Sequence, residues 1–145
     1  MPSDRPTKPT FPARDDAGRI ATVRDMILGT AVWVAVGAAL LIAIDALVSL
    51  AAGGFGHISG WIAGTLAVLM FIEDFRAWRV GPARIGVAMV GAALGVLAGV
   101  VLSGQIGSVL PAVFSGAFAV LLATLVYAVF WFYGVRIMAA RLPER

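Results

Sequence analysis

Long apolar stretches separated by short breaks are the feature that most constrains how this chain can fold. The stretches lie at about residues 26–50, 58–75, 85–102 and 109–135. A helix rises about 1.5 Å per residue, so about 20 apolar residues are enough to cross the roughly 30 Å hydrocarbon core of a bilayer. Glycine and proline clusters between the stretches end each helix. The sequence therefore predicts an all-α integral membrane protein, with a four-helix bundle over residues 26–135.

The composition indicates that lipid is the main solvent of this chain. Hydrophobic residues make up 61% of the 145 residues and charged residues only 13%, against about 45–50% and about 25% in soluble domains. The first apolar stretch is too long for the core of a signal peptide, so we expect an uncleaved helix. The abundance of Ala, Gly and Val is typical of GC-rich bacterial genomes, and we therefore expect a bacterial plasma membrane.

The positive charges predict the orientation of the chain. Every Lys and Arg lies in the first 25 residues, in the segment between the second and third stretches, or in the last ten residues. The other two connecting segments, residues 51–57 and 103–108, hold none. Because Lys and Arg gather on the cytoplasmic side of multi-pass proteins, the sequence predicts that both termini are cytoplasmic.

The two ends of the chain differ from the apolar bundle. Residues 1–25 contain four prolines, which disfavour a helix, so we expect a disordered cytoplasmic tail. As an alternative, Asp15 or Asp16 can cap a short helix through Ile20 that lies on the membrane surface. Residues 136–145 are expected to form a short cytoplasmic tail.

The residue types needed for most catalytic and metal sites are scarce. The chain has no cysteine and one histidine, His57, which excludes thiolate chemistry, Cys-based metal sites and multi-histidine metal sites. No phosphate-binding loop or catalytic triad pattern is present. The basic residues are spread over three segments rather than one stripe, which argues against nucleic-acid binding. We therefore expect no enzyme activity, no metal and no cofactor.

Asp45 is the ionisable residue that stands out within the apolar stretches. A charged residue inside a membrane helix is costly to insert and usually faces protein or water. Asp45 lies near the predicted outer end of the first helix, and His57 follows the next turn. The two side chains can pair across the hairpin. One interpretation is that Asp45 is an interfacial carboxylate bound to the loop backbone or to water. The other is that it forms a proton- or cation-linked site, or a contact with a partner subunit.

Small residues recur every four positions on all four predicted helices. The rows on the third and second helices are Gly91, Gly95 and Gly99, and Gly60 and Gly64. Comparable rows on the first and fourth helices are Ala35, Ala39 and Ala43, and Ser115, Ala119 and Ala123. Small residues let membrane helices approach closely. One interpretation is that these rows pack a single four-helix bundle, and the other is that a row on the third helix faces another subunit. We expect at least one row to lie between subunits.

Charged and aromatic residues cluster at the predicted cytoplasmic end of the second helix. The cluster comprises Glu73, Asp74, Arg76, Trp78 and Arg79. Glu73 and Arg76 are spaced to form an ion pair, and Arg79 is spaced to stack on Phe75. One interpretation is a solvated group of interfacial charges, and the other is a docking patch for a partner protein.

A second aromatic group lies near the end of the fourth helix. It includes Tyr127, Trp131 and Tyr133. Such a group is typical of the aromatic belt at a membrane interface. The alternative is a stacking platform for a lipid headgroup or a quinone ring.

The absence of catalytic patterns and the rows of small residues favour one function over another. We expect a non-catalytic accessory or structural subunit of a larger membrane complex, whose partners are lipid and either other membrane subunits or copies of itself. The alternative is an oligomeric transporter or channel for a proton-coupled or ionic substrate that uses Asp45.

Overall fold

The computed structural model describes residues 11–52, 59–79 and 81–141. Its helices are α1 (Val23–Ala52), α2 (Ser59–Ile62), α3 (Thr65–Ala77), α4 (Ala83–Ile106) and α5 (Ala112–Arg141). Within these residues there is no named strand, and a single isolated β-bridge joins Arg14 to Ile20. The all-helical fold expected from the sequence is therefore confirmed.

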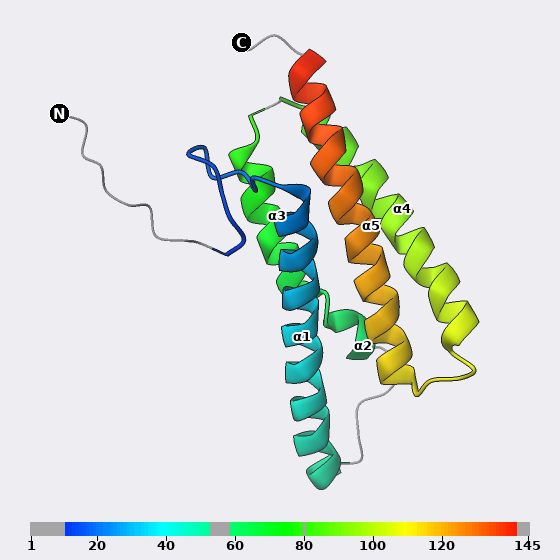
Figure 1. Cartoon of the computed structure of the whole chain (residues 1–145). Helices are drawn as coiled ribbons and strands as arrows, with labels where there is room; N and C mark the ends of the chain where they lie inside the picture. The colour runs from blue at the N-terminus through cyan, green and yellow to red at the C-terminus, as the bar shows by residue number, and fades with distance from the viewer. Residues whose placement is uncertain (1–10, 53–58, 80, 142–145) are drawn as a thin grey trace, which may run out of the picture.

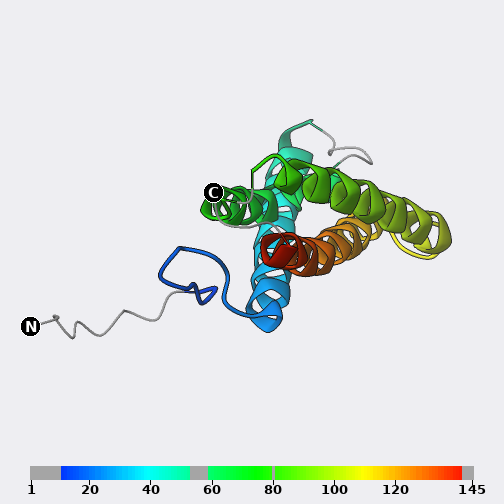
Figure 2. The ribbon, with the colours of Figure 1, turned by 90° about the horizontal axis from the view of Figure 1, so that it is seen from above.

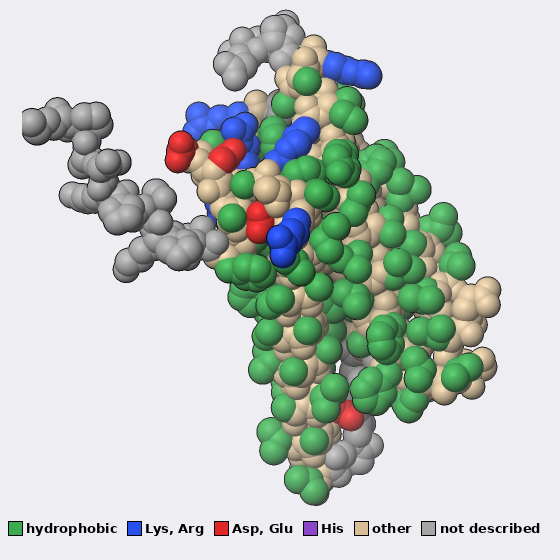
Figure 3. All heavy atoms as spheres, viewed as in Figure 1, with side chains coloured by type: hydrophobic (Ala, Val, Ile, Leu, Met, Phe, Trp, Pro, Cys, Tyr) green, Lys and Arg blue, Asp and Glu red, His purple; other side chains and the backbone are tan. Residues whose placement is uncertain are grey.

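The helices alternate in direction along the long axis of the molecule. The start of α1 and the end of α5 lie at the same end of the molecule (Figure 1). α1 and α4 run away from this end, and α3 and α5 run toward it. Basic and acidic side chains gather at this end, while the rest of the visible face is mostly hydrophobic (Figure 3). We call it the basic end.

Three helices are long and apolar enough to cross a membrane. They lie at Val23–Leu47, Ala83–Ile106 and Phe114–Arg141. The second predicted span, residues 58–75, is not one helix: it consists of the single turn α2 and the 13-residue α3, with a break at Ala63 and Gly64. By itself α3 rises about 20 Å, which is shorter than the roughly 30 Å core of a bilayer. The prediction of four continuous membrane-spanning helices is therefore wrong: the described chain has three long helices and one broken helix.

A compact loop precedes α1. The Asp15 carboxylate accepts hydrogen bonds from the backbone N–H groups of Ala17 and Arg19 at 3.0 and 2.9 Å. Gly18 has φ of 80°, a left-handed conformation that glycine adopts without steric cost. These contacts make a tight turn where the sequence suggested a disordered tail or a surface helix. Residues 1–10 lie outside the described part of the chain.

The first helix begins only at Val23, so the alternative of a helix running through Ile20 is also corrected. The Thr22 hydroxyl accepts a hydrogen bond from the backbone N–H of Asp25 at 3.1 Å. A threonine in this position satisfies a backbone donor that the first turn leaves without a partner. The start of α1 is therefore set by local capping three residues beyond Ile20.

The glycine row of α4 packs against α5 of the same chain. A Cβ atom on Gly95 would run into the backbone of Ala123, and one on Gly99 would meet the backbone of Ala119. A Cβ atom on Gly91 would press on aromatic side chains of α5. α4 and α5 are therefore a close helix pair, and the expectation that this row faces another subunit is corrected.

The broken helix passes between α1 and α5 because glycines remove side chains at the crossings. A Cβ atom on Gly116 of α5 would collide with the backbone of Gly60, and one on Gly64 would collide with Val120. On the other side, Gly37 of α1 lies against the backbone at the break. Gly60 and Gly64 therefore serve packing inside the chain.

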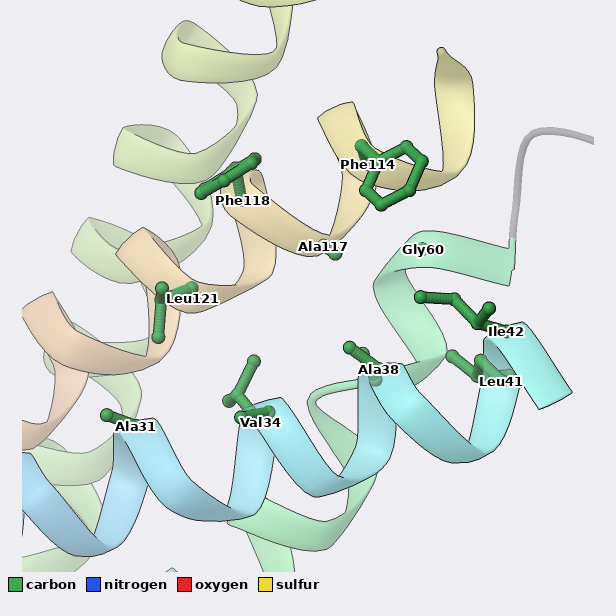
Figure 4. A pocket seen from close by; sticks show the side chains of 12 residues that line it. Ala31, Val34, Ala38, Leu41, Ile42, Gly60, Phe114, Ala117, Phe118 and Leu121 are labelled. Carbon is green, nitrogen blue, oxygen red and sulfur yellow. The ribbon is translucent and has the colours of Figure 1, made fainter. Parts of the chain in front are cut away.

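An apolar hollow of about 210 Å³ separates α1 from α5 beside the break. Figure 4 shows Ala31, Val34 and Ala38 of α1 facing Ala117 and Leu121 of α5 across it. Small side chains on both helices leave this space open. The bundle is thus closely packed along α4 and α5 and loosely closed between α1 and α5.

Candidate functional site

A buried carboxylate organises the basic end of the bundle. Asp74 is only 1% exposed and lies in the last turn of α3. Its Oδ2 atom accepts hydrogen bonds from the indole N–H groups of Trp131 and Trp78 at 2.7 and 3.2 Å. Its Oδ1 atom accepts one from the backbone N–H of Ile20 at 2.8 Å. The carboxylate therefore joins α3 to α5 and to the loop before α1.

Arg136 of α5 completes this group, which we call the Asp74 cluster: Ile20, Asp74, Trp78, Trp131 and Arg136. The guanidinium of Arg136 donates a hydrogen bond to the backbone carbonyl of Ile20 at 2.7 Å. Its positive charge also interacts with Asp74. A charged group is costly to bury unless it is paired and hydrogen-bonded. Here the hydrogen bonds and the nearby cation offset that cost, and they fasten the loop to the bundle.

Aromatic rings surround the cluster. Arg136 lies 5.2 Å from the ring centroid of Trp78, and Arg19 lies 4.8 Å from the same ring. Trp131 stacks on Phe75 with centroids 5.5 Å apart. Trp131 is 0% exposed, so it belongs to the core, where the sequence suggested an aromatic belt at the membrane interface.

The apolar face of α3 could have predicted from the sequence that Asp74 is buried, but the adjacent Glu73 makes this signal hard to see. The buried face of α3 comprises Ala67, Met70, Phe71 and Asp74, and buried Trp78 follows directly after the helix. These positions recur every three or four residues, as the core face of a helix does. A carboxylate on that apolar face is expected inside the bundle, but its neighbour Glu73 makes the pair look like surface charge.

The predicted docking patch is divided by the fold. Asp74 and Trp78 are buried, whereas Glu73, Arg76 and Arg79 are exposed. Glu73 pairs with Arg14 of the loop before α1, at 2.9 Å, rather than with Arg76 as the spacing suggested. The acidic part of the patch is therefore used mainly for contacts within the chain.

Phe75 also has a different partner from the one expected. The guanidinium of Arg84, at the start of α4, lies 4.6 Å from the ring centroid of Phe75, where Arg79 was expected. Arg84 also donates a hydrogen bond to the backbone carbonyl of Trp78 at 2.8 Å. Arg84 thereby ties the α3–α4 connection together and leaves Arg79 exposed.

One titratable group of the loop, outside the membrane-spanning helices, has a shifted pKa. Partial burial of the Asp15 carboxyl raises its pKa, but hydrogen bonds from the backbone and side chain of Arg19 lower it. The net effect is a pKa below the ordinary value of 3.8. The loop is therefore held by a carboxylate that stays ionised at neutral pH.

The pair of Asp45 and His57 is only half described. Asp45 is half-buried and has an interaction partner. His57 lies outside the described residues, so the predicted contact across the hairpin and its role in ion or proton transfer stay predictions.

No protein-family model, no curated protein and no solved structure matches this chain. Among residues 11–52, 59–79 and 81–141, no three His, Cys, Asp or Glu side chains come together as metal ligands. The polar groups of the Asp74 cluster are occupied by internal contacts. Many large hydrophobic side chains on the long helices are exposed.

The small-residue row of α1 differs from the other rows. Ala35, Ala39 and Ala43 are exposed, whereas Ala119 and Ala123 of the α5 row are buried. Large apolar side chains flank the α1 row, among them Leu40 and Leu47, which is 68% exposed. Ala35 lines the hollow that faces α5, whereas Ala39 and Ala43 lie outside it and are exposed.

Proposed function

We propose that the chain is a non-catalytic accessory subunit of a larger membrane complex, and that its basic end faces the cytoplasm. The observation that supports this role is the exposed pair of Ala39 and Ala43 on α1, which continues the small-residue row beyond Ala35. Lipid gives no hydrophobic drive for helices to associate, so close approach at small residues is a main source of helix–helix affinity. The α4 and α5 rows have such a partner inside the chain, and Ala39 and Ala43 are left for another protein.

The apolar length of α1 supports the same role. Residues beyond the α1–α5 hollow, including Leu47 and Leu50, are 68% and 86% exposed. A face that combines small residues with large apolar flanks fits a transmembrane helix of a partner: the small residues admit the partner's backbone, and the flanks pack beside it. The orientation is supported by the gathering of Lys and Arg at the basic end.

The test is purification of the tagged chain from its native membrane in a mild detergent. We expect one membrane protein to co-purify in a fixed ratio with the wild-type chain. The combined substitutions Ala39→Leu and Ala43→Leu should abolish this, because added side chains block close approach. Ala93→Leu is the matched control: Ala93 is an exposed alanine on α4 and its replacement should leave the complex intact.

The size of the purified complex distinguishes the possible partners. A complex of this chain with itself would identify α1 as a homo-oligomer interface. A monomer from wild-type membranes, or equal recovery of the complex with both variants, would contradict the proposed role.

A further inference from the structure

A groove lies between α3 and α4. Its volume is about 660 Å³, within the roughly 300–1,000 Å³ of ordinary ligand sites. Its walls include Val68 and Ile72 of α3 and Ala92 and Val96 of α4, and Tyr127 of α5 forms part of its floor. The groove is therefore apolar along most of its length.

The groove stays open because α4 packs closely along α5, whereas it approaches α3 near its own start, where Arg84 contacts Phe75. α4 meets α5 closely at its glycine row, whereas large rings separate α3 from α5: the centroids of Phe71 and Tyr127 lie 4.6 Å apart. From above, α4 and α5 lean together away from α3 (Figure 2). These rings keep α3 away from α5, and the groove between α3 and α4 remains.

The end of the groove toward the basic end is positively charged. Arg76 lines the groove, and Arg79 follows it three residues later. Both are exposed, and in the described part of the chain neither is paired with a carboxylate. Their neighbour Glu73 is engaged by Arg14. Arg76 therefore places an exposed cation at the edge of the apolar groove. Arg79 adds a second exposed cation shortly after the end of α3.

The length of the groove matches one leaflet of a bilayer. From Val68 to Arg76 on α3, and from Ala88 to Val96 on α4, each wall rises about 12 Å. Half of the roughly 30 Å hydrocarbon core is about 15 Å. With the arginines at the level of the headgroups, the apolar walls extend through most of the acyl-chain region of that leaflet.

From this combination we infer that the groove binds an anionic phospholipid, with one acyl chain between α3 and α4 and the phosphate beside Arg76 and Arg79. Basic pockets between transmembrane helices on the cytoplasmic side bind anionic headgroups. Charge complementarity favours such a lipid over a zwitterionic one. The inference uses a different surface from the proposed partner face on α1, so each can fail without the other.

The experiment is native mass spectrometry of the full chain with phosphatidylglycerol or phosphatidylcholine of identical acyl chains. We expect a clear preference for phosphatidylglycerol. Each basic residue near an anionic headgroup is worth about fivefold in affinity. The variant with Arg76→Gln and Arg79→Gln should therefore lose roughly 30-fold of that preference.

Two alanines that are adjacent in sequence provide a matched test of the apolar slot. Ala92 lines the groove and Ala93 does not, although both are exposed on α4. Ala92→Phe should fill the slot and lower retention of phosphatidylglycerol, whereas Ala93→Phe should retain it as the wild type does. Thermal unfolding of both variants reports whether they are folded, and the arginine variant tests the inference if Ala92→Phe does not fold.

Three results would overturn the inference. The first is equal retention of the two lipids by the wild type. The second is unchanged preference in the double arginine variant. The third is loss of a partner protein, but not of lipid, in Ala92→Phe, which would assign the groove to a partner helix.

Discussion

The basic end of the bundle and the far half of α1 are held in opposite ways. At the basic end, Asp74 accepts three hydrogen bonds from two tryptophans and a backbone N–H. A hollow separates the middle of α1 from α5, and in the far half of α1, beyond that hollow, Leu47 and Leu50 are exposed. One region is fixed by polar contacts inside the chain, and the other presents apolar surface to its surroundings.

The difference shows that the charged groups of this chain stabilise one end of the molecule. In an apolar environment an unsatisfied polar group is expensive, so satisfied polar groups specify one arrangement strongly. Apolar contacts between helices compete with equally apolar lipid and specify an arrangement weakly, except where small residues allow close approach. The basic end is therefore expected to be the rigid anchor of the molecule, and the far half of α1 the part available for association.

Removal of the Asp74 carboxylate should have the largest effect. Asp74→Ala leaves two indole N–H groups and a backbone N–H buried without an acceptor, and we expect a loss of about 3–5 kcal/mol of stability. Thermal unfolding in detergent micelles measures it. Glu73→Ala is the control, since this neighbour is exposed and should cost less than about 1 kcal/mol. Similar losses for both variants would contradict the special role of Asp74.

The part of α1 beyond the hollow, around Leu47, should respond more weakly to truncation than the part that packs on the core around Leu41. Leu41 packs against the core and Leu47 is exposed on the same helix. We expect Leu41→Ala to cost roughly 2 kcal/mol and Leu47→Ala less than about 0.5 kcal/mol in the isolated chain. The same unfolding assay compares them. An equal loss from Leu47→Ala would mean that the far half of α1 is already packed inside the chain.

Loss of the ion pair between Arg14 and Glu73 should loosen the loop without unfolding the bundle. The pair is largely exposed on the Glu73 side, so Glu73→Gln should cost less than about 1 kcal/mol and the difference should shrink in high salt. The Glu73→Gln substitution leaves Arg14 and Arg19 of the loop in place as trypsin cleavage sites. We expect faster cleavage after Arg14 and Arg19, measured by mass spectrometry, and an unchanged rate would show that the Asp74 cluster alone holds the loop.

Acid should have the smallest effect, and it should act on the same loop. The folded-state pKa of Asp15 lies below its ordinary value of 3.8, so its stabilising contribution is present above that pH and is lost as the pH falls through the lowered pKa. Cleavage of the loop by an acid-active protease should therefore rise at the low end of its pH range. Asp15→Asn should remove this pH dependence, and a variant that keeps it would point to another carboxylate.

Much of the helical framework could be predicted from the sequence, because apolar runs and Gly–Pro breaks act locally. The Asp74 cluster could not be read in the same way. Ile20 and Asp74 are 54 residues apart, and only the tertiary fold shows that the proline-rich segment docks on α3. Whether Asp74 or Glu73 faces the core depends on the rotation of α3 about its axis, which follows from the spacing of Met70, Asp74 and Trp78.

The rows of small residues show the same limit. Rows on α1, α4 and α5 have similar spacing, yet Gly95 meets Ala123 inside the chain while Ala39 is exposed. Spacing indicates that a helix can approach another closely, but only the fold shows which row already has a partner. The break at Ala63 and Gly64 was likewise hidden inside an apolar run.

The most direct test of the partner face on α1 is site-specific crosslinking in native membranes. Because the chain has no cysteine, Ala39→Cys and Ala93→Cys each provide one attachment point for a thiol-reactive photocrosslinker. We predict that the probe at position 39 gives one discrete protein adduct and that the probe at position 93 gives only lipid adducts. The same adducts at both positions, or only lipid at position 39, would contradict the account.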